Sequence, residues 1–198
     1  MAFGTKNILI VYSSGYGTTR EVSEKIYDIL NLEPLFNITL KSIHEPFDVN
    51  KYDYFIIGSS IRADQLLANV RDFLSYNNNI LRYKKIALFV VCLAANTLHG
   101  QHQVENTVYR QLAEKYPQLK IIDLAAFGGK IDFNKLNPVM QDLIKHVFRK
   151  TGIKANGSID TRDWDQITRW AVSLKEKITN GNIPTVLVPI GVEQNEKN

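Results

Sequence analysis

The chain has 198 residues, of which 44% are hydrophobic, and it carries a formal net charge of +4 at pH 7. These values are typical of one globular domain with its own core, and no apolar run is long enough to span a bilayer. The single cysteine, Cys92, excludes an internal disulfide and a cysteine-built metal site. No signal-like segment or nucleic-acid motif is evident, so we expect a cytoplasmic protein. Its mild basic charge is compatible with peripheral contact with the inner face of the membrane.

Five short apolar runs predict the strands of a sheet. Most are apolar throughout rather than alternating, which is typical of parallel strands buried on both faces. In chain order they cover 7–12, 35–43, 52–60, 85–95 and 119–127, and the second is the weakest.

Helical patterns lie between and after these runs, at 18–30, 66–81, 103–116, 137–151 and 162–178. Alternation of strands and helices indicates an α/β protein with a doubly wound sheet. We therefore predict a flavodoxin-like three-layer sandwich, a five-stranded parallel sheet with helices on both faces. Its ligand should bind outside the carboxyl ends of the strands.

Residues 1–179 are predicted to form this domain, and residues 180–198 a C-terminal tail. Residues 152–161 read as a loop. The tail contains the apolar segment TVLVPI, which could add an edge strand or pack on a neighbouring subunit. Its prolines limit how much of a strand ladder it can form.

The loop YSSGYGTT, residues 12–19, joins the first strand to the first helix. Free amides at a helix N-terminus, hydroxyl donors and flexible glycines together suit a phosphate. The loop has no lysine and no Gly-x-Gly-x-x-Gly pattern, so it differs from nucleotide triphosphatase and dinucleotide loops. The alternative is a helix capped by Thr18 or Thr19. The predicted binding residues here are Ser13, Ser14, Gly15, Tyr16, Gly17, Thr18 and Thr19.

This stretch, ILIVYSSGYGTTREVSEKI, resembles the phosphate loop of flavodoxins. The segments YDYFIIGSSIRADQLLANVRDFL, FGGKIDFNKLNPVMQDLIKHVFRKTG and DTRDWDQITRWA resemble a narrower group. That group is the flavodoxin-domain proteins related to menaquinone-dependent protoporphyrinogen oxidase, and the resemblance covers roughly residues 6–178. It implies an FMN cofactor and transfer of electrons from a reduced substrate, such as a porphyrinogen, to a quinone-type acceptor.

The resemblance also implies that two further loops bind the flavin. Ser59 and Ser60 would hydrogen-bond ribityl or ring oxygens, while Asn96 and Thr97 would bind the polar edge of the ring. The predicted residues of these loops are Ser59, Ser60, Ile61, Arg62, Leu93, Ala94, Ala95, Asn96 and Thr97.

Arg62 is the predicted catalytic residue. A cation near the N1–C2 edge of the flavin would stabilise its reduced anion. The same guanidinium could instead hold a substrate carboxylate. The alternative is a surface arginine paired with Asp64 or another acidic residue.

Two other functions stay open. The second and third loops contain no aromatic residue, which leaves the ring accessible to a substrate, although Tyr16 could reach it. A flavodoxin-type electron-transfer protein that docks to a redox-protein partner is one alternative, against which the basic charge counts. A domain that has lost its cofactor and serves as an interaction module is the other.

Overall fold

The computed structural model describes residues 4–139, 141–142 and 157–181. Its centre is a sheet of five parallel strands in the order β2-β1-β3-β5-β6, which confirms the predicted flavodoxin-like fold. The strands are β1 (Lys6–Ser13), β2 (Phe36–Ser42), β3 (Tyr54–Arg62), β5 (Lys85–Val91) and β6 (Lys120–Phe127). The middle strands are apolar throughout because helices cover both faces of the sheet.

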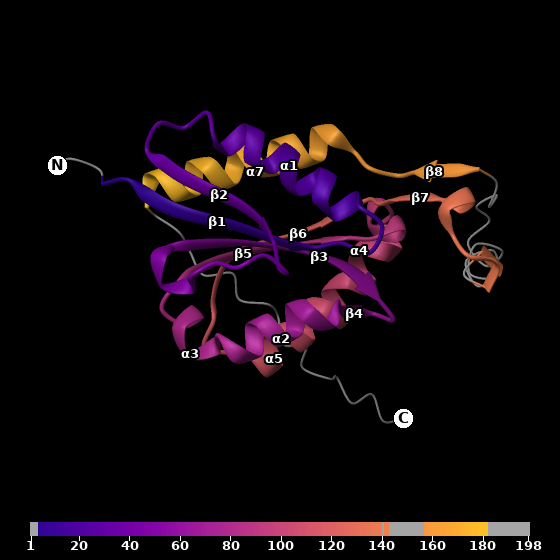
Figure 1. Ribbon diagram of the computed structural model, residues 1–198, viewed down its shortest axis with the longest axis horizontal. Helices are drawn as coiled ribbons and strands as arrows, with labels where there is room; N and C mark the ends of the chain where they lie inside the picture. The colour runs from indigo at the N-terminus through magenta and orange to yellow at the C-terminus, as the bar shows by residue number, and fades with distance from the viewer. Residues whose placement is uncertain (1–3, 140, 143–156, 182–198) are drawn as a thin grey trace, which may run out of the picture.

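Helices α1 (Thr18–Leu30) and α7 (Trp164–Asn180) cover one face (Figure 1). The other face is covered by α2 (Ala68–Tyr76), α3 (Asn78–Leu81) and α5 (Arg110–Lys115). Each face has its own apolar core, with Phe55 near Phe73 in one and Phe89 against Trp170 in the other. Among the described helices, none has the length and apolar character needed to cross a bilayer.

Two predicted helices differ in detail from those observed. The pattern over 66–81 begins as a short strand, β4 (Gln65–Leu66), and divides at Asn77 into α2 and α3. Asn77 leaves the helical conformation, with φ −101° and ψ 9°, and its side chain donates to the carbonyl of Phe73 at 2.9 Å, which caps the end of α2. The helix predicted over 103–116 begins earlier, as α4 (Leu98–Val104), and continues through a π-helical turn, Glu105–Tyr109, into α5.

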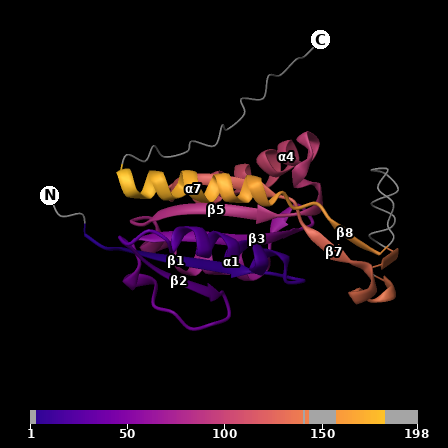
Figure 2. The same cartoon turned by 90° about the horizontal axis from the view of Figure 1, so that it is seen from above.

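A second, two-stranded sheet lies at the carboxyl end of the main one (Figure 2). It pairs β7 (Lys130–Asp132) with β8 (Ser158–Asp160) in antiparallel fashion. β8 falls within the stretch that we expected to be a loop, so that expectation is wrong for its last residues. Most of the predicted helix 137–151, and the tail from residue 182, lie outside the described residues.

Candidate functional site

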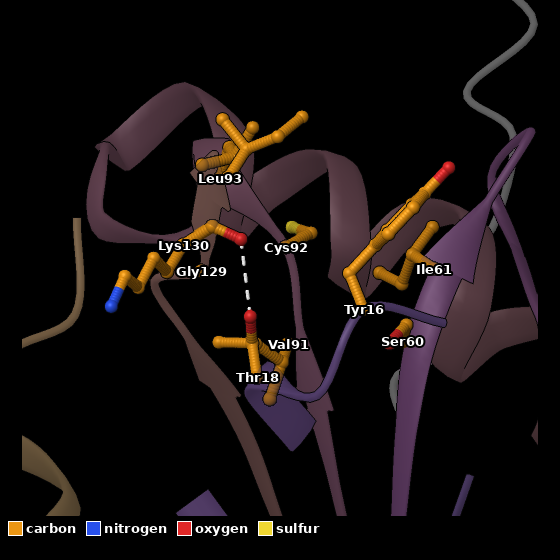
Figure 3. Close-up of a pocket in the computed structure, with 10 residues that line it drawn as sticks. Tyr16, Thr18, Ser60, Ile61, Val91, Cys92, Leu93, Gly129 and Lys130 are labelled. Atoms are coloured by element: carbon orange, nitrogen blue, oxygen red, sulfur yellow. Dashed lines mark hydrogen bonds between the residues drawn. The ribbon is translucent and has the colours of Figure 1, made fainter. Parts of the chain in front are cut away.

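Three loops and β7 meet at the carboxyl ends of the central strands and enclose a cleft of about 160 Å³. Figure 3 shows Tyr16 and Ile61 along one side, with Leu93, Gly129 and Lys130 along the other. Five predicted residues line it: Tyr16, Thr18, Ser60, Ile61 and Leu93. The structure therefore brings residues from all three predicted loops to one place.

The first loop ends where helix α1 begins at Thr18. Gly17 adopts a φ of 90°, a left-handed conformation that glycine takes without strain, and the helix has no side-chain cap. The alternative interpretation, in which Thr18 or Thr19 caps the helix, is therefore wrong. The amides of the first helical turn have no partner within the helix and can bind an anion.

The Ser14 hydroxyl gives an independent indication of a ligand here. Its oxygen is buried and finds no hydrogen-bond partner within the described part of the chain. A buried, unsatisfied hydroxyl is unfavourable, and a phosphate oxygen beside the loop would satisfy it. Ser14, the flexible Gly17 and the start of α1 thus fit the phosphate of FMN.

The two threonines of the first loop have their hydroxyls engaged by neighbouring strands. Thr18 donates to the main-chain carbonyl of Lys130 at 3.1 Å, and Thr19 shares a 2.7 Å hydrogen bond with Ser60. Both contacts join the loop to other walls of the cleft. They indicate that the two threonines hold the loop in position, and their direct contact with phosphate stays a prediction.

The second loop is a tight hairpin between β3 and β4, in which Arg62 pairs with Gln65. Its two turn residues, Ala63 and Asp64, have φ values of 49° and 55°. Two successive left-handed residues form the turn that best matches the twist of a hairpin, but alanine rarely adopts that conformation. The turn therefore carries local strain beside the predicted catalytic residue.

Arg62 is exposed and extends toward the first loop. A guanidinium nitrogen lies 4.0 Å from where a Cβ on Gly15 would stand. Asp64, its suggested alternative partner, instead accepts a hydrogen bond from Gln103 at 2.8 Å. Within the described residues the guanidinium forms no recorded ion pair, so it is available to a ligand.

The remaining predicted residues are differently placed. Ser59 is fully buried, and its hydroxyl donates to the Ser60 carbonyl and accepts from the Leu67 amide. Thr97 caps α4 by accepting from the Gly100 amide at 3.0 Å. Ser13 is buried at the end of β1, and Ala95 is buried in the third loop, whereas Ala94 and Asn96 are exposed. Contact of these residues with FMN stays a prediction.

Five residues of the cleft were not among those predicted, namely Val91, Cys92, Gly129, Lys130 and Ile131. The glycine pair at 128–129 was the only signal in the sequence. A Cβ on Gly129 would stand 3.3 Å from main-chain atoms of Cys92 and Leu93, so glycine permits this close approach. Burial raises the pKa of the Cys92 thiol, which is therefore protonated at neutral pH.

Solved structures with the same fold include flavodoxins. A flavodoxin from Archaea shares 13% identity, with a TM-score of 0.55, over 87% of this chain and 99% of its own. Flavodoxin 1 from Bacillus cereus shares 16% identity at a TM-score of 0.53, over 88% of this chain and 98% of its own. The flavodoxin of Streptococcus pneumonia TIGR4 shares 11% identity, with a TM-score of 0.56, over 88% of this chain and 99% of its own.

At these identities the likeness shows the fold alone. A search of curated proteins gave no match. The family model described as Flavodoxin domain, in contrast, matches residues 9–158 of the sequence. This match indicates FMN as the cofactor, as predicted, and the phosphate-binding features of the first loop agree with it. The chain belongs to the flavodoxin domain family.

Proposed function

We propose that the protein is an FMN-dependent oxidoreductase related to the protoporphyrinogen oxidase group. It would pass electrons from a reduced substrate, such as a porphyrinogen, through FMN to a quinone-type acceptor. The observation that supports this proposal is the composition of the cleft walls. Apart from Tyr16, which is 55% exposed, the walls are aliphatic or polar, so an aromatic side chain is available on one side only. A flavin ring bound there would keep a face accessible to an organic substrate.

The residues of the chain divide between anchoring and electrostatics. Ser14 and the amides at the start of α1 would hold the phosphate, and Ile61 would contact the ring. Bound FMN supplies the reversible uptake of electrons, which no side chain of this cleft can provide. Arg62 would place a positive charge between phosphate loop and ring, where it favours the reduced, more negative cofactor.

The first experiment is titration of the purified protein with FMN, followed by anaerobic reduction and mixing with a menaquinone analogue. Tight FMN binding and rapid reoxidation by the quinone would support the proposal. Tight binding with slow quinone reoxidation, and two well-separated one-electron potentials, would instead favour the electron-transfer protein that docks to a redox partner. Absence of FMN binding would contradict both and favour the interaction module.

One variant, compared with two ligands, tests phosphate anchoring separately from the chemistry. Ser14→Ala should weaken FMN binding by about 10- to 100-fold, the loss expected for one hydrogen bond to a charged group. Riboflavin, which lacks the phosphate, should bind the variant and the original protein equally. An equal loss for both ligands would show that Ser14 supports the fold of the loop instead.

Arg62→Ala tests the electrostatic role. We expect a lower reduction potential and slower quinone reduction, with FMN binding largely retained. Arg82→Ala removes the same charge just before β5, at the opposite end of the sheet, and should change neither property. Unchanged potential and turnover in Arg62→Ala would contradict the role of Arg62 while leaving FMN binding intact.

A further inference from the structure

The hairpin turn that carries Arg62, residues 62–65, is fixed to two helices by its last two side chains. The Gln65 side chain accepts a hydrogen bond from the guanidinium of Arg71 in α2. The Asp64 carboxylate accepts a hydrogen bond of 2.8 Å from the side-chain amide of Gln103 in α4. This second contact joins residues that are 39 positions apart, so the turn depends on a helix formed much later in the chain.

Gln103 lies where α4 meets the hairpin. It is the second-last residue of α4 and directly precedes Val104 and the π-helical turn Glu105–Tyr109. Val104 and Tyr109 are both buried, and their separation of five residues is the spacing of a π-helical turn. Gln103 itself is exposed, and β4 contacts the same π-helical turn. The Thr107 hydroxyl donates to the Gln103 carbonyl at 2.6 Å and so helps to hold Gln103 in place.

The Asp64 carboxylate has two possible partners, Gln103 and Arg62. Arg62 lies two positions earlier on the same turn, and a carboxylate is a strong partner for a guanidinium. In the structure the carboxylate accepts from Gln103 instead, while the Arg62 guanidinium extends toward Gly15. An ion pair between Asp64 and Arg62 would neutralise the guanidinium. The partner of Asp64 therefore decides how much of the Arg62 charge acts on a ligand in the cleft.

The negative charge of Asp64 also influences the cleft. Cys92 lines the cleft, and burial is the main cause of the raised pKa of its thiol, to which the Asp64 carboxylate adds. A carboxylate at this distance opposes the effect of Arg62 on a reduced, more negative flavin. Gln103 binds that carboxylate through a neutral amide and so adds no charge of its own.

We propose that Gln103 is a positioning residue for electron transfer, because its hydrogen bond to Asp64 keeps this carboxylate from pairing with Arg62. The guanidinium then stays available to FMN. The inference rests on the proposed function, in which Arg62 stabilises the reduced cofactor. Gln103 acts only through Asp64, and its loss should resemble a partial loss of the charge on Arg62.

The reduction potential of bound FMN measures this effect. In Gln103→Ala the Asp64 carboxylate is free to pair with Arg62, so the potential should fall. We expect reduced FMN to bind about two- to fivefold more weakly relative to oxidised FMN, the effect of one exposed ion pair. Gln101→Ala is the matched control. It removes a glutamine of the same helix that lies in a groove beside β6, and it should leave the potential unchanged.

Asp64→Asn tests whether Gln103 acts through Asp64. Asparagine tolerates the left-handed conformation of this residue, whose φ is 55°, but it cannot form an ion pair with Arg62. Gln103→Ala should therefore lower the potential in the original chain and have no effect when combined with Asp64→Asn. Independently of the cofactor, NMR of the FMN-free protein should show a nuclear Overhauser contact between the Asp64 side chain and the side-chain amide of Gln103.

Three results would overturn the inference alone. If Gln103→Ala lowered the potential equally with and without Asp64→Asn, Gln103 would support the hairpin without acting through Asp64. If Arg62→Ala lowered the potential but Gln103→Ala did not, Asp64 would not compete for Arg62. Absence of the nuclear Overhauser contact would show that the hydrogen bond does not persist in solution. An unchanged potential in Arg62→Ala, in contrast, would contradict the proposed role of Arg62 and this inference together.

Discussion

The Thr18 hydroxyl donates to the main-chain carbonyl of Lys130 at 3.1 Å and joins the phosphate loop to β7. The two residues are 112 positions apart in the chain. The contact connects the small β7–β8 sheet directly to the loop that we expect to bind the phosphate. The Thr18 side chain, which we expected to bind the ligand, thus serves as a structural link between the first loop and β7.

Thr18→Val should therefore destabilise the protein by about 1 kcal/mol, because the buried side chain keeps its shape but loses a hydrogen bond. FMN binding should weaken as well, since the loop loses its connection to β7. Chemical denaturation and FMN titration would measure the two effects. Thr18→Ser keeps the hydroxyl and should retain most of the affinity. A full loss of binding in the serine variant would contradict this assignment.

Arg162 forms a second link between the small sheet and α1. Its guanidinium, 5% exposed, lies 2.6 Å from an Asp160 oxygen and 2.5 Å from a Glu21 oxygen, and it stacks on Trp164. The hydrogen bond from Arg162 lowers the pKa of Asp160 below its ordinary value. The folded state therefore favours the charged carboxylate, and this stabilisation is present above the unfolded pKa of about 3.9.

We predict that Asp160→Asn lowers the free energy of unfolding at pH 7 by less than about 1 kcal/mol, since the carboxylate is partly exposed and screened. The difference from the original protein should stay constant down to about pH 5 and close as the pH falls through the folded pKa of Asp160. Urea denaturation at several pH values would measure it. If the difference in free energy of unfolding between Asp160→Asn and the original protein grew larger in acid, the prediction for this ion pair would be contradicted.

The sequence predicted the main sheet and the first loop because their signals are local. Continuous apolar runs mark buried strands, and the Gly17–Thr18 junction marks the start of α1 at the residue where it is observed. β7 and β8 have three residues each and too little pattern to be recognised. Their pairing depends on long-range contacts, such as that of Gly128, whose Cβ would stand 1.9 Å from the Thr161 carbonyl.

Side-chain partners were the least predictable feature of the site. The Ser59 hydroxyl, expected to face FMN, donates to the Ser60 carbonyl and accepts from the Leu67 amide, and residue type alone does not predict these partners. Trp164 is 38% exposed, with Arg162 over its ring. Trp170, on the same helix, instead packs against Phe89 and Phe127. Residue type alone does not distinguish the two tryptophans.

Gly100 fixes the third loop against helix α4. A Cβ at this position would stand 1.9 Å from the Ala94 carbonyl oxygen, so Gly100→Ala must displace the main chain of the loop. We expect a loss of stability of about 1–3 kcal/mol, the usual effect of overpacking, and weaker binding of FMN. Thermal denaturation and FMN titration would measure both. Gly4→Ala is the control, since nothing lies within 4 Å of its Cβ position.

In the strained hairpin beside Arg62 we expect a substitution to stabilise the protein, in contrast to Gly100→Ala. Ala63 has a φ of 49°, and a left-handed conformation costs a non-glycine residue about 1–2 kcal/mol. Ala63→Gly removes this strain, while the added freedom of glycine in the unfolded chain offsets about 0.4–1 kcal/mol. The variant should therefore be more stable by a few tenths to about 1 kcal/mol.

The same substitution in a helix should have the reverse sign. Ala113 lies within α5, where glycine costs about 1 kcal/mol, so Ala113→Gly should destabilise the protein. Urea denaturation would compare the two variants under the same conditions. If Ala63→Gly stabilises the fold and slows quinone reduction, the strain serves to hold Arg62 toward the phosphate loop. If it stabilises the fold with turnover unchanged, the turn only closes the hairpin. Destabilisation by Ala63→Gly would show that the backbone conformation of Ala63 is not strained.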